Sequence, residues 1–213
     1  HSQIVQYSNR LFNGNPTQFG LHGLKEIVGV AVNYLFCKFC DENIQNLAWI
    51  ASIGICGDTL QHIDQMSSYN HQIIQEAADL GQLVIKKGIC LYGGQFDRMD
   101  RALSLSILPF IPKVYGDRKI AKKILENLDV PPNTKVEDLS HAQRDIILSH
   151  FQNLDLSGEY IIFPRKKGII RYGFEHAQIL SIIGHEHPYR AIQLIGEPRS
   201  EEHTSELQSL LII

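Results

Sequence analysis

The sequence predicts an α/β protein that is rich in helices, and three observations support this prediction. Within residues 47–61, the first eleven residues are almost wholly apolar, which indicates a buried helix. Apolar residues recur at i, i+3 and i+4 spacing through residues 24–40 and 66–82, as they do along one face of a helix. Residues 159–195 have the pattern of strand, helix and strand, which is typical of the start of an α/β unit.

The composition is that of an ordinary globular protein. The chain has 213 residues, of which 44% are hydrophobic and 20% charged, and this length suits one large domain or two small ones. No apolar run reaches the roughly 18 residues that span a bilayer, so we expect no membrane partner. Four scattered cysteines favour a reducing cytoplasm over a disulfide framework. The net charge of −3 neither indicates nor excludes a polyanionic partner, because such binding depends on a local basic surface.

In the first half of the chain, helices account for most of the pattern. The helix of 24–40 contains Gly29, which costs about 1 kcal/mol relative to alanine and therefore indicates close packing. The helix of 66–82 is expected to end at Gly81, because glycine suits the position that follows a helix. Residues 83–92 are expected to pass from helix to strand.

In the second half, prolines separate the predicted elements. Pro109 is expected to end one helix, and residues 131–134 are expected to form a proline-rich loop that is a candidate domain boundary. The expected elements are helices at 102–108, 117–128, 137–153 and 174–183, and strands at 159–164 and 191–195.

Asp58 is the first candidate for chemistry, because it directly follows the apolar stretch. Gly57 is expected to turn the chain and present the carboxylate at the mouth of a cleft. A metal ion would suit this position, since an unpaired buried carboxylate is costly. Asp58 could also cap a helix that follows it. The spacing alone leaves both interpretations open.

Two further patterns have ordinary structural interpretations. Cys37 and Cys40 have the spacing of metal ligands, but no second pair accompanies them, and we expect buried core thiols. Basic residues cluster at 118–123 and 165–171. Such clusters usually form solvated faces, and they can also bind nucleic acid.

A histidine pair follows the last predicted helix. His185 and His187 are two residues apart, so they do not share a helix face. We expect a helix end and a turn before Pro188 rather than a metal site. An alternative is that His185 and Arg190 contact a phosphate group.

Four segments carry a resemblance to a known family. They are residues 15–31, residues 53–58 (Ile53-Gly54-Ile55-Cys56-Gly57-Asp58), residues 92–112 with Tyr92-Gly93-Gly94, and residues 170–196. Together they resemble the DHH phosphoesterase superfamily, in particular its archaeal RecJ-like nucleases associated with the replicative helicase. The second segment resembles the family's fourth motif, in which an aspartate binds a divalent metal.

The resemblance implies how the chain is divided. Residues 1–65 would be the helix-rich C-terminal part of a DHH catalytic domain, and residues 66–155 a helical connecting region. Residues 156–198 would begin a smaller α/β DHH-associated domain that binds substrate. Residues 199–213 resemble a translated sequencing adapter and are expected to be a non-native tail, so the chain is expected to be an internal fragment.

The resemblance also implies a two-metal site for Mn²⁺ or Mg²⁺. Asp58 would be a catalytic metal ligand, and His1 would be the last histidine of the DHH triplet and a second ligand. The other ligands would precede residue 1, so this fragment alone is expected to be inactive. The residues expected to contact substrate are His22, Arg98, His185 and Arg190. The glycine-rich substrate loop of the family is absent here, and His185 stands where an arginine is common.

The implied activity is that of a cytoplasmic exonuclease in DNA replication or repair, which hydrolyses single-stranded DNA or RNA as a metal-dependent phosphodiesterase. Replicative helicase proteins such as GINS are implied partners. One alternative is a catalytically inactive structural component of the helicase. Another is a small-molecule phosphodiesterase or pyrophosphatase of the same superfamily, although the long helical region at 66–155 favours a polymer substrate.

Overall fold

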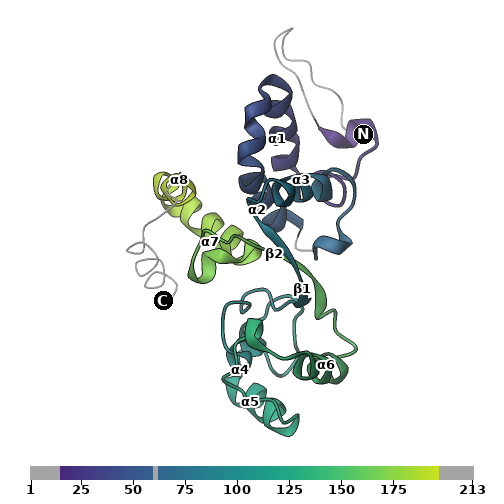
Figure 1. Cartoon of the computed structure of the whole chain (residues 1–213), viewed down its shortest axis with the longest axis vertical. Coiled ribbons are helices and arrows are strands. Elements are labelled where there is room, and N and C mark those ends of the chain that lie inside the picture. The colour runs from purple at the N-terminus through teal and green to yellow at the C-terminus, as the bar shows by residue number, and fades with distance from the viewer. Residues whose placement is uncertain (1–14, 60–61, 197–213) are drawn as a thin grey trace.

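The computed structural model describes residues 15–59 and 62–196, and its fold is mixed α/β with mostly helices (Figure 1). This confirms the predicted class at a coarse level. The described helices are α1 (Gly29–Cys40), α2 (Ala48–Thr59), α3 (Ser68–Asp79), α4 (Met99–Leu105), α5 (Arg118–Asn127), α6 (His141–His150), α7 (Gly173–Glu186) and α8 (Pro188–Gly196). The strands are β1 (Val84–Ile89) and β2 (Ser157–Ile162).

The two strands form an antiparallel ribbon between two helical lobes (Figure 1). The first lobe contains α1, α2, α3, α7 and α8, and the second lobe consists of residues 90–156 with α4, α5 and α6. At one end of the ribbon Val84 pairs with Ile162, and at the other end Ile89 pairs with Ser157. The chain therefore leaves the first lobe along β1 and returns to it along β2.

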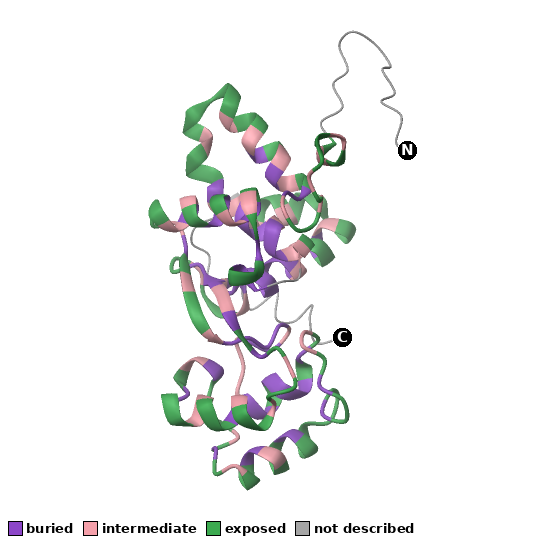
Figure 2. Ribbon diagram, turned by 90° about the vertical axis from the view of Figure 1, so that its right-hand side faces the viewer, coloured by how far each residue is buried: buried purple, intermediate pink, exposed green. Residues whose placement is uncertain are grey.

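Each lobe has its own hydrophobic core (Figure 2). The first core joins α1, α2 and α3 with the end of β2, and the second core joins α4, α5 and α6. The helix α3 lies in the first lobe, although its residues fall in the predicted connecting region of 66–155. The domain boundaries themselves stay a prediction.

The apolar stretch forms the central helix of the first lobe, as predicted. Half of the residues of α2 are buried, and its glycines permit neighbouring helices to approach. A Cβ atom at Gly54 would lie 2.8 Å from Val30 Cγ1 of α1, and one at Gly57 would lie 3.0 Å from Ala177 Cβ of α7. The prediction of a turn at Gly57 is wrong, because α2 continues to Thr59.

The predicted strand at 191–195 is wrong, because these residues lie in α8. Pro188 is the first residue of this helix. Proline is common at this position, because a backbone N–H there would have no partner within the helix and none is lost. The run Ala191-Ile192-Gln193-Leu194-Ile195 is short enough that its apolar character does not separate strand from helix. The predicted strand–helix–strand unit is therefore wrong, and β2 pairs with β1 instead.

The first helix begins later than predicted. Residues 24–28 precede α1 as a turn, and Leu24 is 59% exposed. The C-terminal part of α1 extends beyond the core, so Cys37 and Cys40 are exposed and the prediction of buried thiols is wrong for both.

Several other helix ends agree with the predictions. Gly81 follows α3 with φ +66°, the left-handed conformation that glycine adopts readily. The side chain of Asp117 accepts hydrogen bonds at the start of α5, and the 131–134 loop precedes the second-lobe helix α6. Within the described residues, none of the helices is both long enough and apolar enough to pass through a membrane.

Candidate functional site

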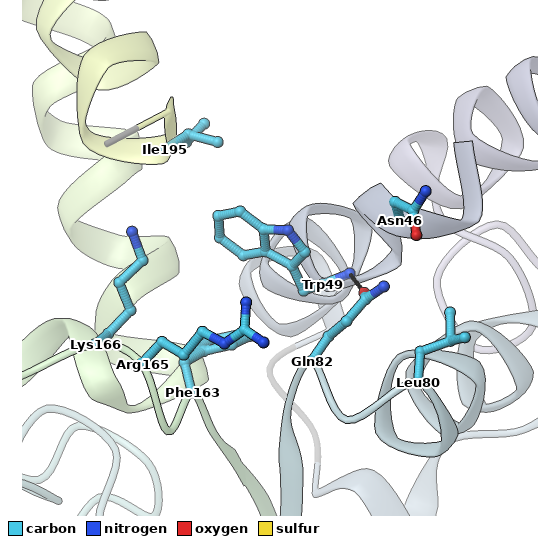
Figure 3. Close-up of a pocket in the computed structure, with 8 residues that line it drawn as sticks. All are labelled: Asn46, Trp49, Leu80, Gln82, Phe163, Arg165, Lys166 and Ile195. Carbon is cyan, nitrogen blue, oxygen red and sulfur yellow. Dashed lines mark hydrogen bonds between the residues drawn. The ribbon is translucent and has the colours of Figure 1, made fainter. Parts of the chain in front are cut away.

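A cavity of about 470 Å³ lies beside the start of α2 (Figure 3). This volume is within the range of small-molecule sites. Its lining combines aromatic, basic and amide side chains from the two ends of the first lobe's sequence: Asn46, Trp49, Leu80, Gln82, Phe163, Arg165, Lys166 and Ile195.

Trp49 is fixed in this cavity by the start of its helix. The first N–H groups of a helix have no partner within the helix. The backbone N–H of Trp49 donates to Gln82 Oε1 at 3.0 Å, and Gln82 Nε2 donates to the carbonyl of Gln45 at 3.0 Å. Gln82 therefore ties the start of α2 to the segment between α3 and β1, and the indole of Trp49 projects into the cavity (Figure 3).

Basic side chains lie on one side of the indole. Lys166 Nζ is 5.4 Å from the centroid of the Trp49 ring, a distance at which a cation is attracted to an aromatic face. Partial burial lowers the pKa of the Lys166 ammonium from its ordinary value. Arg165 is exposed, and the ring of Phe163 meets the indole edge to face at 6.1 Å. The cavity thus combines an aromatic surface with two cations.

His176 packs behind this cavity wall. Its ring is 5.7 Å from that of Phe163 and almost perpendicular to it. His176 is fully buried, and neither ring nitrogen has a hydrogen-bond partner within the described part of the chain. Burial lowers the pKa of this imidazole to about 3, so the ring is neutral near pH 7. His176 is therefore a packing residue and not an acid or base at the cavity.

Asp58 lies at the other end of α2. It is nine residues from Trp49, which places the two residues about 13 Å apart along the helix axis and on roughly opposite faces. The side chain of Asp58 is exposed at the surface, and partial burial raises the pKa of its carboxyl. Asp58 does not cap a following helix, because α3 begins only after Ser67. The helix-cap interpretation is therefore wrong.

The described residues do not by themselves fit the implied two-metal site. Such a site needs several carboxylates and histidines that converge. Within residues 15–59 and 62–196, no group of three or more His, Cys, Asp or Glu side chains is placed to hold a metal ion. Asp58 is the one predicted ligand in these ranges, and His1 lies outside them. Metal binding by either residue stays a prediction.

The predicted substrate contacts are spread over both lobes. His22 forms a turn before α1, where its Nδ1 accepts from the N–H groups of Leu24 at 3.3 Å and Lys25 at 3.2 Å. The remaining three are Arg98, directly before α4, His185 in the last turn of α7, and Arg190 in α8. The structure does not gather these side chains around one site, and their contacts with substrate stay predictions.

The prediction of a helix end at the histidine pair is confirmed. The helix α7 ends at Glu186, and His187 follows it as the capping residue. Trp49 is not among the predicted site residues, although it is the single tryptophan of the chain and stands near the start of the apolar stretch. The basic cluster at 165–171 is among the predicted features, and the structure brings the first residues of that cluster to Trp49.

Comparison with known proteins identifies no relative of this chain. No protein-family model matches the sequence, and no curated protein matches it. Inferences about function therefore depend on the residues themselves and on the family resemblance described above.

Proposed function

We propose that this chain binds a single strand of DNA or RNA at the Trp49 cavity, as part of a metal-dependent phosphodiesterase. The observation that supports this proposal best is the position of Trp49 between Lys166 and the amide side chains of Asn46 and Gln82 (Figure 3). Proteins that bind single strands combine aromatic rings, on which bases stack, with cations that contact the phosphates. The cavity contains both kinds of side chain.

The site favours unpaired bases over a duplex. In a duplex each base face is covered by its neighbours, whereas an unstacked base can lie against an indole. Lys166 and Arg165 supply positive charge beside the ring, so the net charge of −3 for the whole chain does not oppose the proposal. The amides of Asn46 and Gln82 could contact the edge of a base.

The hydrolytic part of the proposal depends on Asp58 and on the resemblance to the fourth DHH motif. The carboxylate is accessible, so it could bind Mn²⁺ or Mg²⁺ together with ligands outside the described residues. We therefore propose an exonuclease of DNA replication or repair that acts in the cytoplasm.

The emission of Trp49 tests strand binding directly, because the chain contains one tryptophan. We expect oligo(dT) of ten nucleotides to quench this emission, and a duplex of the same length to leave it unchanged. Trp49→Ala should weaken binding by about 5- to 150-fold, the range that corresponds to the loss of one stacked base. Fluorescence anisotropy of a labelled oligonucleotide measures this loss.

A matched aromatic variant controls for non-specific effects. Tyr189 in α8 is 83% exposed and does not line the cavity, so Tyr189→Ala should leave the affinity unchanged. Oligonucleotide binding that proceeds without any change in Trp49 emission would contradict the proposed site.

A catalytically inactive structural role is a second candidate, because the resemblance also extends to relatives that serve as structural parts of the replicative helicase. The two candidates differ in Mn²⁺-dependent release of nucleotides by the longer protein that the resemblance implies. If that protein is an enzyme, Asp58→Ala should abolish release while Trp49 is still quenched. Asp79→Ala, which removes an exposed carboxylate at the end of α3, should have no effect.

Two outcomes would change these conclusions. Release that persists in Asp58→Ala would remove the role assigned to Asp58. Failure of the unaltered longer protein to release nucleotides would favour the structural role, in which replicative helicase proteins such as GINS would be the partners.

A further inference from the structure

A second group of cations lies in the second lobe, at a groove of about 640 Å³ between α4 and α5. Arg98 precedes α4, and the other basic residues occupy the first turns of α5. The packing of these two helices brings together residues that are about 20 positions apart in the sequence (Figure 1). The lining residues are Arg98, Asp100, Arg118, Lys119, Lys122, Pro132 and Asn133.

A buried carboxylate holds the two arginines in place. Asp100 is 3% exposed, and its Oδ2 accepts from Arg118 Nε at 2.8 Å and from Arg98 Nη2 at 3.2 Å. Its Oδ1 accepts from the backbone N–H of Arg101 at 2.9 Å. Asp100 therefore orients both guanidinium groups before any ligand arrives.

The arginines keep donor groups for a ligand. The side chains of Arg98 and Arg118 are 43% and 50% exposed, although each contributes one nitrogen to Asp100. A guanidinium has five N–H donors, which match the oxygens of a phosphate in pairs. Because one carboxylate serves two arginines, the cluster of these three residues retains positive charge.

Two lysines extend the positive surface along α5. Lys119 and Lys122 are exposed, and four basic side chains against the single Asp100 give the lining a net charge of +3. Lys122 Nζ is 3.6 Å from Glu126 Oε1, a surface pair of little energetic weight. The carboxylate of Asp117 is engaged by backbone N–H groups of α5.

We propose that this groove is a phosphate-binding site, separate from the Trp49 cavity. Among the described residues that line it there is no aromatic ring, so it suits phosphate groups and not bases. The phosphates could belong to a nucleic-acid strand or to a free polyphosphate. The inference stands without the proposed function, because it depends only on residues of the second lobe.

The test uses charge reversal at the two lysines, because truncating either arginine would leave Asp100 buried with too few partners. Sodium tripolyphosphate and oligo(dT) of twenty nucleotides are the probes, and isothermal titration calorimetry measures their affinities for the full chain. We expect Lys119→Glu with Lys122→Glu to weaken binding of tripolyphosphate by about tenfold or more. Lys123→Glu is the matched control, because Lys123 lies on the same helix, is exposed and does not line the groove.

The oligonucleotide identifies the source of the phosphates. If the groove binds a strand, the double variant should lower the dependence of log affinity on log salt by about 1.4, as expected for two lost phosphate contacts. If only tripolyphosphate binding is weakened, the groove binds a free polyphosphate.

Two results would overturn the proposal: unchanged affinity of the double variant for both probes, or an equal loss in Lys123→Glu. Circular dichroism melting of each variant confirms that the fold is retained. Quenching of Trp49 reports on the first-lobe cavity separately, so failure of one site is distinguishable from failure of the other.

Discussion

Glu175 lies where α7 of the first lobe meets the segment that opens the second lobe. It is 3% exposed, and its Oε1 accepts the backbone N–H groups of Gln95 at 3.1 Å and Gly93 at 3.3 Å. Burial raises the pKa of its carboxyl to about 7, although these two donors offset part of the effect. The stability of the protein should therefore depend on pH through this residue.

The direction in which stability changes with pH follows from the protonation of Glu175 in the folded and in the unfolded state. An unfolded glutamate ionises near pH 4.5, whereas the folded carboxyl keeps its proton to about pH 7. Between these values the folded state binds more protons, so the free energy of unfolding falls as pH rises. From pH 5 to pH 8 the loss should be roughly 2–3 kcal/mol. Glu175→Gln should remove this loss, as urea unfolding at both pH values would measure.

Glu186 provides a control on the same helix. Its side chain is exposed at the end of α7, so Glu186→Gln should keep the pH dependence of the unaltered protein. A Glu175→Gln variant with that same pH dependence would show that the carboxyl of Glu175 is not held protonated.

The residues Asp58 and Trp49 show how much of the candidate sites can be predicted from the sequence. Asp58 was identified because of the residues before it, and the structure confirms the buried helix but leaves the carboxylate at the surface. Trp49 had no distinguishing pattern, because a tryptophan in an apolar run is usually a core residue. Lys166 lies in the segment after β2, more than 100 residues further along the chain than Trp49, and no local pattern encodes a contact between residues so far apart.

At the scale of elements, Gly94 fixes the approach of α4 to the end of β1. A Cβ atom at this position would lie 2.6 Å from Ala102 Cα and 2.7 Å from the Ala102 carbonyl oxygen. Both are backbone atoms, so no side-chain movement can relieve the overlap. We expect Gly94→Ala to lower the free energy of unfolding by about 1–3 kcal/mol or more, measured as a lower urea midpoint.

Gly184→Ala is the matched substitution. Its added Cβ would lie 3.8 Å from Ala191 Cβ, an ordinary contact, and alanine is favoured over glycine inside a helix. This variant should gain up to about 1 kcal/mol. A urea midpoint of Gly94→Ala equal to that of the unaltered chain would contradict the close approach of α4.

The position of the capped helix α5 was predicted well, whereas the helices predicted at 102–108 and 137–153 are α4 at Met99–Leu105 and α6 at His141–His150. The 117–128 helix agrees with α5 to within one residue at each end, because Asp117 caps its start. The strand predicted at 191–195 failed because five apolar residues are too few to reveal a period. The start of α1 was placed too early, because the turn formed by His22 and residues 24–28 contains apolar residues at helical spacing.

At the scale of the whole molecule, the sequence predicted the class of fold but not the two-lobed arrangement. The antiparallel ribbon forms by pairing between residues 84–89 and residues 157–162, which are far apart in the chain. Local pattern does not reveal such a pairing. The charged groove between α4 and α5 was missed for the same reason, although both Arg98 and the 118–123 cluster had been noted separately.

The ribbon also determines how the protein can tolerate changes in length. Because Ile89 faces Ser157 across the ribbon, the chain starts and finishes its path through the second lobe at neighbouring points. Residues added to or deleted from loops of that lobe would leave the spacing of these two points unchanged. The helices around α2 would keep their packing, so the outer lobe is free to differ in size while the Trp49 cavity stays the same.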